Sequence, residues 1–204
     1  MKRFDVITAM SKVITPDDLV TTSIGQTWDD WWNLKPANNT FFTGILGSVS
    51  STALGLAVSL PHRRIVSIES DGSMLLNTGI MCTLGKERPP NLTVVVMDNG
   101  IYENIGGPPT HTSANTDLAK MAEGAGCLNC HTARSMDDFD AQFRRMLQDN
   151  EMGYLVAKIE PLERHPWKWE QRKPTDGVED SISCATSKSS KVSSFIPARR
   201  KIER

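Results

Sequence analysis

Residues 64–100 read RIVSIESDGSMLLNTGIMCTLGKERPPNLTVVVMDNG, and this stretch decides the fold. Residues 64–69 and 92–98 are short β-branched runs bounded by polar or turn residues, which is typical of strands buried in a parallel sheet. A segment of helix length, around 75–85, lies between them. A strand, a helix and a second strand within about 35 residues predict a β–α–β crossover unit.

Similar patterns on either side extend this unit into a larger fold. Apolar spacing predicts helices at 5–14, 49–60, 116–124 and 135–148, and β-prone runs predict strands at 19–22 and 154–159. The predicted fold class is therefore α/β, with a mainly parallel sheet and helices on both faces. Residues 1–170 form the predicted domain. Residues 171–204 are rich in Ser, Lys and Arg without apolar periodicity, so we expect a solvated, disordered tail.

The composition excludes some function classes. Lys plus Arg (23) nearly balances Asp plus Glu (24), so no overall basic field favours binding to nucleic acid or to an anionic membrane. The sequence has no run of eighteen apolar residues, and its start is too polar for a signal peptide. We expect a soluble, cytoplasmic protein.

The four cysteines are better interpreted as thiols than as a disulfide framework. Cys127, Cys130 and His131 match the C-x-x-C-H spacing of haem c attachment, although haem attachment normally needs an exported chain. The cysteine pair could also be a redox pair or half of a zinc site, but the sequence has no second C-x-x-C. Ordinary packing near a strand is the preferred interpretation.

Two polar turns follow the strands of the crossover unit. Asp71, Gly72 and Ser73 follow the first strand, and Asn99 follows the second. In open α/β sheets ligands bind outside the carboxyl ends of the strands, so both turns can converge on one site. Carboxylate and amide oxygens suit magnesium, and backbone N–H groups at a helix start suit phosphate. Either turn taken alone is more simply a turn.

The two turns resemble the bipartite cofactor motif of thiamine diphosphate enzymes. SDGS at 70–73 and DNG at 98–100 carry this resemblance, and GSV at 47–49 with ALGLA at 53–57 is similar to the upstream part of the diphosphate-binding domain. GGPPT at 106–110 looks most like the sulfopyruvate and phosphonopyruvate decarboxylase group. The similarity spans residues 1–165 and leaves out the tail.

The resemblance implies a set of site residues. Asp71, the Asn99 side chain and the Ile101 carbonyl would hold Mg²⁺, and Gly72 and Ser73 would bind the diphosphate through backbone or hydroxyl donors.

The resemblance also places residues 47–49 against the organic part of the cofactor. The Gly47 carbonyl would meet the exocyclic nitrogen of the aminopyrimidine, Ser48 lies in the same loop, and Val49 would be the apolar wedge beneath the bent cofactor. Without the resemblance, Val49 could equally be a core valine.

Three positions depart from the motif. Ser70 replaces its first glycine, Asp98 replaces its first asparagine, and Ser50 replaces the glycine common after the wedge residue. Ser70 matters most if its backbone needs a positive φ, which would strain a serine by roughly 1 kcal/mol. We expect Asp98 to affect the turn more than the metal.

The resemblance implies a 2-oxo acid decarboxylase subunit that acts on a small 2-oxo acid. In this family a glutamate on a separate pyrimidine-binding domain activates the cofactor, and 204 residues leave no room for both domains. We therefore expect the catalytic glutamate on a partner chain, in a hetero-oligomer. The alternatives are a 2-oxo acid oxidoreductase subunit and a non-catalytic cofactor-binding or assembly subunit.

Other candidate residues have weaker support. His111 and Glu103 lie near the motif and could titrate in the site, but solvated surface roles are at least as well supported. For Trp28, Trp31 and Trp32, surface or interface packing is preferred over catalysis.

Overall fold

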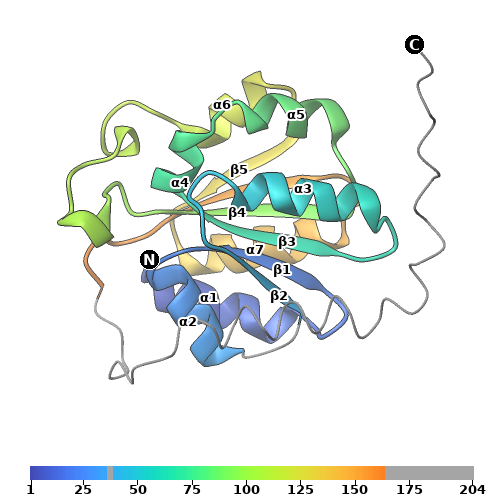
Figure 1. Ribbon diagram of the computed structural model, residues 1–204, viewed down its shortest axis with the longest axis horizontal. Coiled ribbons are helices and arrows are strands. Elements are labelled where there is room, and N and C mark those ends of the chain that lie inside the picture. Colours follow the sequence, from blue (N-terminus) through green and yellow to red (C-terminus); the bar gives the residue numbers. More distant parts are fainter. Residues whose placement is uncertain (36–38, 164–204) are drawn as a thin grey trace, which may run out of the picture.

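Six parallel strands form one sheet in the order β2-β1-β3-β4-β6-β5 (Figure 1). The computed structural model describes residues 1–35 and 39–163, and the predicted tail lies outside these residues. The strands are β1 (Leu19–Ser23), β2 (Thr40–Thr43), β3 (Ile65–Ser70), β4 (Leu92–Asp98), β5 (Asn129–Ala133) and β6 (Gly153–Lys158). The predicted parallel α/β fold is confirmed.

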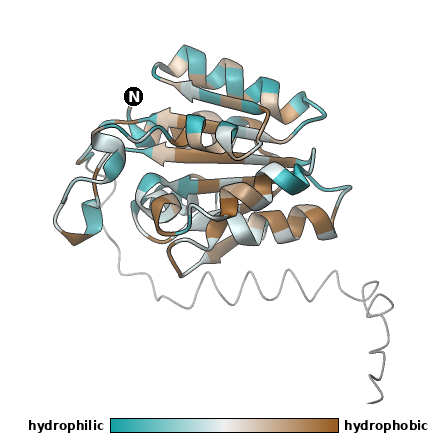
Figure 2. Cartoon of the chain, turned by 90° about the horizontal axis from the view of Figure 1, so that it is seen from above, coloured by the Kyte–Doolittle hydropathy of each residue, from teal (hydrophilic) through white to brown (hydrophobic). Residues whose placement is uncertain are grey.

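Helices cover both faces of the sheet (Figure 1). One face carries α3 (Val49–Ser59), α4 (Asp71–Leu76), α5 (Ile80–Glu87) and α6 (Leu118–Gly124), and the other carries α1 (Arg3–Val13), α2 (Gln26–Leu34) and α7 (Met136–Gln148). Neighbouring strand residues alternate between the two cores: Val94 and Val96 pack with α3–α6, and Val95 packs with the other helices. Figure 2 shows strands that are largely hydrophobic, flanked by helices of mixed hydropathy.

Within the described residues, no helix is long and apolar enough to cross a membrane.

The segment predicted as one helix at 75–85 is two helices. Helix α4 begins at Asp71, directly after β3, and α5 begins at Ile80. Asn77 ends α4 because its backbone leaves the helical region (φ −143°, ψ 56°), and its side-chain amide instead donates to the Gly47 carbonyl at 2.8 Å. The Asn77 side chain, at the break between the two helices, thus links the end of α4 to the loop before α3.

The tryptophans have two different environments. Trp31 is completely buried, and its Nε1 donates to Thr40 Oγ1 at 3.0 Å. The prediction of surface or interface packing is therefore wrong for Trp31. Trp28 and Trp32 are partly buried and stack with ring centroids 5.1 Å apart, and Trp28 also lies against Phe42.

The cysteine pair packs beside β5, as predicted. Cys127 is buried in the core with α6, and the Cys130 thiol donates to the Cys127 carbonyl at 3.5 Å. Both residues lie at the amino end of β5, away from the strand ends where the polar turns gather.

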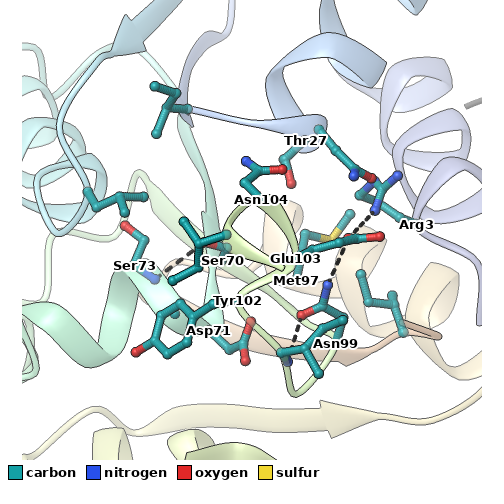
Figure 3. A pocket seen from close by; sticks show the side chains of 17 residues that line it. Arg3, Thr27, Ser70, Asp71, Ser73, Met97, Asn99, Tyr102, Glu103 and Asn104 are labelled. Carbon is teal, nitrogen blue, oxygen red and sulfur yellow. Dashed lines mark hydrogen bonds and ion pairs between the residues drawn. The ribbon is translucent and has the colours of Figure 1, made fainter. Parts of the chain in front are cut away.

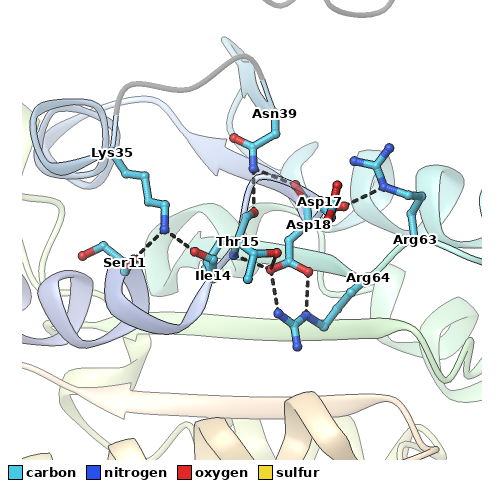
Figure 4. A network of polar contacts seen from close by, with 9 residues as sticks. All are labelled: Ser11, Ile14, Thr15, Asp17, Asp18, Lys35, Asn39, Arg63 and Arg64. Atoms are coloured by element: carbon cyan, nitrogen blue, oxygen red, sulfur yellow. Dashed lines mark hydrogen bonds and ion pairs between the residues drawn. The ribbon is translucent and has the colours of Figure 1, made fainter. Parts of the chain in front are cut away.

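A polar network ties the sheet together at its amino end (Figure 4). Arg64 Nε and Nη2 donate to the two carboxylate oxygens of Asp18 at 2.7 and 2.6 Å, and the Thr15 N–H donates to the same carboxylate at 2.6 Å. This bidentate contact joins the start of β1 to the start of β3, and the Asp18 side of it is buried. The network is structural, because ligand sites in such sheets form at the opposite, carboxyl edge.

Candidate active site

A cavity of about 140 Å³ opens at the carboxyl ends of β1, β3 and β4 (Figure 3). Its walls come from residues 24–27 after β1, residues 70–73 after β3 and residues between 97 and 105 after β4, together with Arg3, Leu46 and Ile159. The two polar turns predicted to converge therefore do meet, because their parallel strands are neighbours in the sheet.

Asp71 is the buried carboxylate of this cavity. It is the first residue of α4, its Oδ2 accepts a hydrogen bond from Thr110 Oγ1 at 2.7 Å, and the same oxygen lies 3.0 Å from Thr112 Oγ1. Burial raises the pKa of Asp71 above its ordinary value, and the negative charge of Asp98 adds to this, while the Thr110 hydroxyl opposes it. A bound cation would offset the cost of ionising this carboxylate.

Asn99 and Ile101 contribute oxygens to the same cavity. Asn99 Oδ1 accepts from the Ile101 N–H at 3.1 Å, and Asn99 Nδ2 donates to Glu103 Oε2 at 3.1 Å, which fixes the orientation of the amide. The described residues hold no cluster of three or more His, Cys, Asp or Glu side chains. A metal here would thus use one carboxylate, one amide oxygen and one backbone carbonyl, an all-oxygen set that suits a hard cation such as Mg²⁺.

Glu103 belongs to a charged network that the sequence did not predict. Arg3, buried on α1, donates through Nη1 to Glu103 Oε2 at 3.2 Å and through Nε to Asp30 Oδ2 at 2.7 Å. No local signal could have found this contact, because 100 residues separate its partners. His111 is exposed and does not line the cavity.

The turn after β3 accommodates the first departure from the motif without strain. Ser70 has an extended backbone (φ −114°, ψ 155°), and its hydroxyl accepts from the Ser73 N–H at 3.3 Å as the N-cap of α4. The concern about positive φ therefore does not apply. Gly72 is required for another reason: a Cβ there would lie 2.5 Å from the Tyr102 ring. The missing side chain makes room for the Tyr102 ring at the start of α4.

A second helix start also faces the cavity. Gly25, with φ +104°, precedes α2, and Gln26 and Thr27 line the wall. Gln26 Oε1 is buried and has no hydrogen-bond partner among residues 1–35 and 39–163. Such a group commonly awaits a ligand or water, so it fits a polar group bound in the cavity. The sequence did not predict these residues, although a glycine shortly after strand 19–22 is the same strand-end signal as at Gly72.

The loop before α3 lies against the turn after β3. Gly47 has φ +81°, a conformation that favours glycine, and its N–H donates to Ser73 Oγ at 2.8 Å. Ser48 precedes α3 and is half-buried, and Val49, the first residue of α3, is fully buried. The loop and the turn are therefore joined by a direct hydrogen bond.

Asp98, the second departure, is a buried charge with two partners. Its side chain is 1% exposed, Oδ2 pairs with the Lys158 ammonium, and Oδ1 accepts from Thr112 Oγ1 at 2.7 Å. Since Thr112 also contacts Asp71, Asp98 is connected to the candidate metal ligand through one hydroxyl.

Comparison with known proteins defines the class. Over residues 24–157 the sequence matches the family described as thiamine pyrophosphate enzyme, C-terminal TPP binding domain, and the chain belongs to this family. The resemblance inferred from the cofactor motif is confirmed.

Individual relatives show which members of this family the chain resembles. The chain is 32% identical to the sulfopyruvate decarboxylase subunit beta of Methanocaldococcus jannaschii, covering 78% of this chain and 85% of that protein. It is 33% identical to the phosphonopyruvate decarboxylase of Streptomyces viridochromogenes, over 60% of this chain but only 30% of that protein. The solved structure of benzoylformate decarboxylase from Polynucleobacter necessarius shares the fold, with a TM-score of 0.66 at 15% identity, and this chain spans 33% of its length.

Proposed function

We propose that this chain is the thiamine diphosphate- and Mg²⁺-binding subunit of a 2-oxo acid decarboxylase of the sulfopyruvate or phosphonopyruvate type. The observation that carries the proposal is the convergence of Asp71, Asn99 and Ile101 on one cavity at the ends of neighbouring strands. The similarity to sulfopyruvate decarboxylase subunit beta over most of both chains supports it.

The residues around the cavity fit the cofactor. Asp71, Asn99 and the Ile101 carbonyl would hold Mg²⁺. The diphosphate would lie against the backbone of Gly72 and Ser73 at the start of α4, where the helix dipole favours negative charge. When bound, thiamine diphosphate supplies the nucleophilic carbon and accepts the electrons released as CO₂ leaves.

Residues 47–49 would contact the organic part of the cofactor. The Gly47 carbonyl already accepts from Asn77, and a carbonyl oxygen has a second lone pair for the aminopyrimidine. Ser48 would line the same loop, and Val49 would support the bent cofactor.

A partner chain with a pyrimidine-binding domain would complete the site. The cavity of about 140 Å³ is smaller than ordinary small-molecule sites, which start at about 300 Å³, and this supports the proposal that another chain completes the enclosure. Three of the residues that line it, Ile24, Leu46 and Ile105, are 46%, 42% and 74% exposed, as expected of a rim that another chain covers. The activating glutamate would come from that partner, and we place the hetero-oligomer in the cytoplasm.

The test is CO₂ release from sulfopyruvate, phosphonopyruvate and pyruvate, by the purified chain alone and after adding a pyrimidine-domain partner. The expected result is little or no turnover alone and restored turnover in the mixture, because an open site leaves water to weaken its electrostatics. Robust turnover by the rigorously purified single chain would defeat the two-chain proposal. Magnesium-dependent cofactor binding without turnover in the mixture would indicate a non-catalytic subunit instead.

A further inference from the structure

Glu69 is a buried carboxylate next to the site that has no role in the proposed function. It is the residue before Ser70 on β3, is 1% exposed and does not line the cavity. Its Oε2 accepts from the Ser50 N–H at 3.3 Å and from the Ser50 hydroxyl at 3.2 Å, and its Oε1 accepts from the Ser70 N–H at 3.2 Å. Burial raises the pKa of Glu69, and these donors oppose that rise.

Ser73 links the loop before α3 directly to the turn after β3. Its Oγ accepts from the Gly47 N–H at 2.8 Å.

Glu69 also joins these two segments, which are far apart in sequence. Residues 47–50, the wedge loop, connect to it through the N–H and the hydroxyl of Ser50, and residues 70–73, the metal-side turn, connect to it through the Ser70 N–H. Ser50 also lies in the first turn of α3, so the helix dipole stabilises the carboxylate.

Two of the three departures from the cofactor motif meet at this carboxylate. A glycine at position 50 would supply no hydroxyl, whereas the serine present here supplies one to Glu69. Ser70 donates only its N–H to Glu69, as a glycine there also would, and its hydroxyl caps α4. The serine at position 50 is therefore the departure that strengthens the junction between the wedge loop and the metal-side turn.

We infer that Glu69 is a positioning residue, which holds the wedge loop and the metal-side turn at a fixed separation so that both ends of one cofactor are bound together. The inference rests on the proposed function, because it assigns the organic part of the cofactor to residues 47–49 and the diphosphate to residues 70–73. Glu69 acts through these segments and touches neither the metal ligands' cavity nor the substrate.

Two magnesium complexes separate this role from general stabilisation. Thiamine diphosphate spans both segments, whereas inorganic pyrophosphate reaches only the metal-side turn. Calorimetric titration of the full chain with each probe, in the presence of Mg²⁺, should show that Ser50→Ala and Glu69→Gln weaken thiamine diphosphate binding about 10-fold, or about 1.4 kcal/mol. Pyrophosphate affinity should stay within about 2-fold of wild type, since neither substitution removes a donor of the metal-side turn.

Ser67→Ala is the matched control. Ser67 lies two residues before Glu69 on the same face of β3 and is buried, and its hydroxyl has no partner among the described residues, so its removal should change neither affinity. Ser50→Ala removes one hydroxyl donor but keeps the carboxylate and the N–H donors of Ser50 and Ser70, so it tests the role even if Glu69→Gln does not fold.

The outcomes distinguish the inference from the proposed function. Unchanged thiamine diphosphate affinity in a folded Ser50→Ala chain overturns the positioning role and leaves the proposed function standing. Equal losses for both probes also overturn it, because they indicate general loss of structure. A wild-type chain that binds neither probe overturns the proposed function and this role with it.

Discussion

Lys158→Met tests whether the second motif departure, Asp98, depends on its charge partner. The substitution keeps an unbranched side chain but removes the ammonium that pairs with the Asp98 carboxylate. That carboxylate is 1% exposed and keeps the Thr112 hydroxyl as a donor. Removing one partner of a buried ion pair costs about 3–5 kcal/mol. Because the Lys158 side chain is 28% exposed and Thr112 remains, we expect a loss of about 2 kcal/mol in the free energy of unfolding, or about 6 °C in Tm.

A double-mutant cycle, measured by urea and thermal unfolding without metal, gives the decisive comparison. Asp98→Asn restores the residue usual in the motif and removes the charge, so Asp98→Asn/Lys158→Met should lie within about 1 kcal/mol of wild type, with a coupling energy of about 1–2 kcal/mol. The matched control is Lys86→Met, which breaks an exposed pair with Glu87 and should change stability by less than about 0.5 kcal/mol. Additive costs in the cycle would refute the idea that Lys158 compensates Asp98.

Four further outcomes are expected. Asp71→Ala should abolish Mg²⁺-dependent cofactor binding in calorimetric titration while the chain stays folded, and unchanged affinity would remove Asp71 from the metal site. Because burial raises the folded-state pKa of Asp71 above 3.8, metal-free stability should fall as pH rises from 3.8 through that raised value, and urea unfolding of Asp71→Asn should show a flatter profile. Gly85→Ala would place a Cβ 2.1 Å from the Ala125 carbonyl oxygen and should lower the free energy of unfolding by about 3 kcal/mol. Gly55→Ala, with nothing within 4 Å of its Cβ, should raise it by up to about 1 kcal/mol, and equal shifts in Tm for the two variants would contradict the clash. Deleting residues 176–204, which lie outside the described residues, should leave cofactor affinity nearly unchanged, and a large drop in Tm would show that this segment docks.

The sequence predicts the centre of the sheet better than its edges. Strands β3 and β4 are rich in Ile and Val and are buried on both faces, and they were predicted within one residue. Strands β2 and β5 were missed. They lie at the two edges, and short or polar segments such as NCHTA at 129–133 become strands only through their neighbours.

The candidate site also has residues that the local sequence predicts and contacts that depend on residues far apart in the sequence. Asp71 and Asn99 were predicted to meet because each directly follows a strand, and strand ends converge in a parallel sheet. The contacts of Arg3 with Glu103, and of Glu69 with Ser50, join residues that have no common sequence pattern. Only the order of the strands and helices brings them together.

The packing of α1 against α7 has a consequence for how the chain folds as it is synthesised. Helix α1 ends at Val13 and α7 begins at Met136, and the two pack in the same core. At usual translation rates the delay between them is on the order of 10 s. During that time the apolar face of α1, with Ile7 and Met10, has no completed core to enter, so this helix is the segment where a ribosome-associated chaperone would be expected to bind.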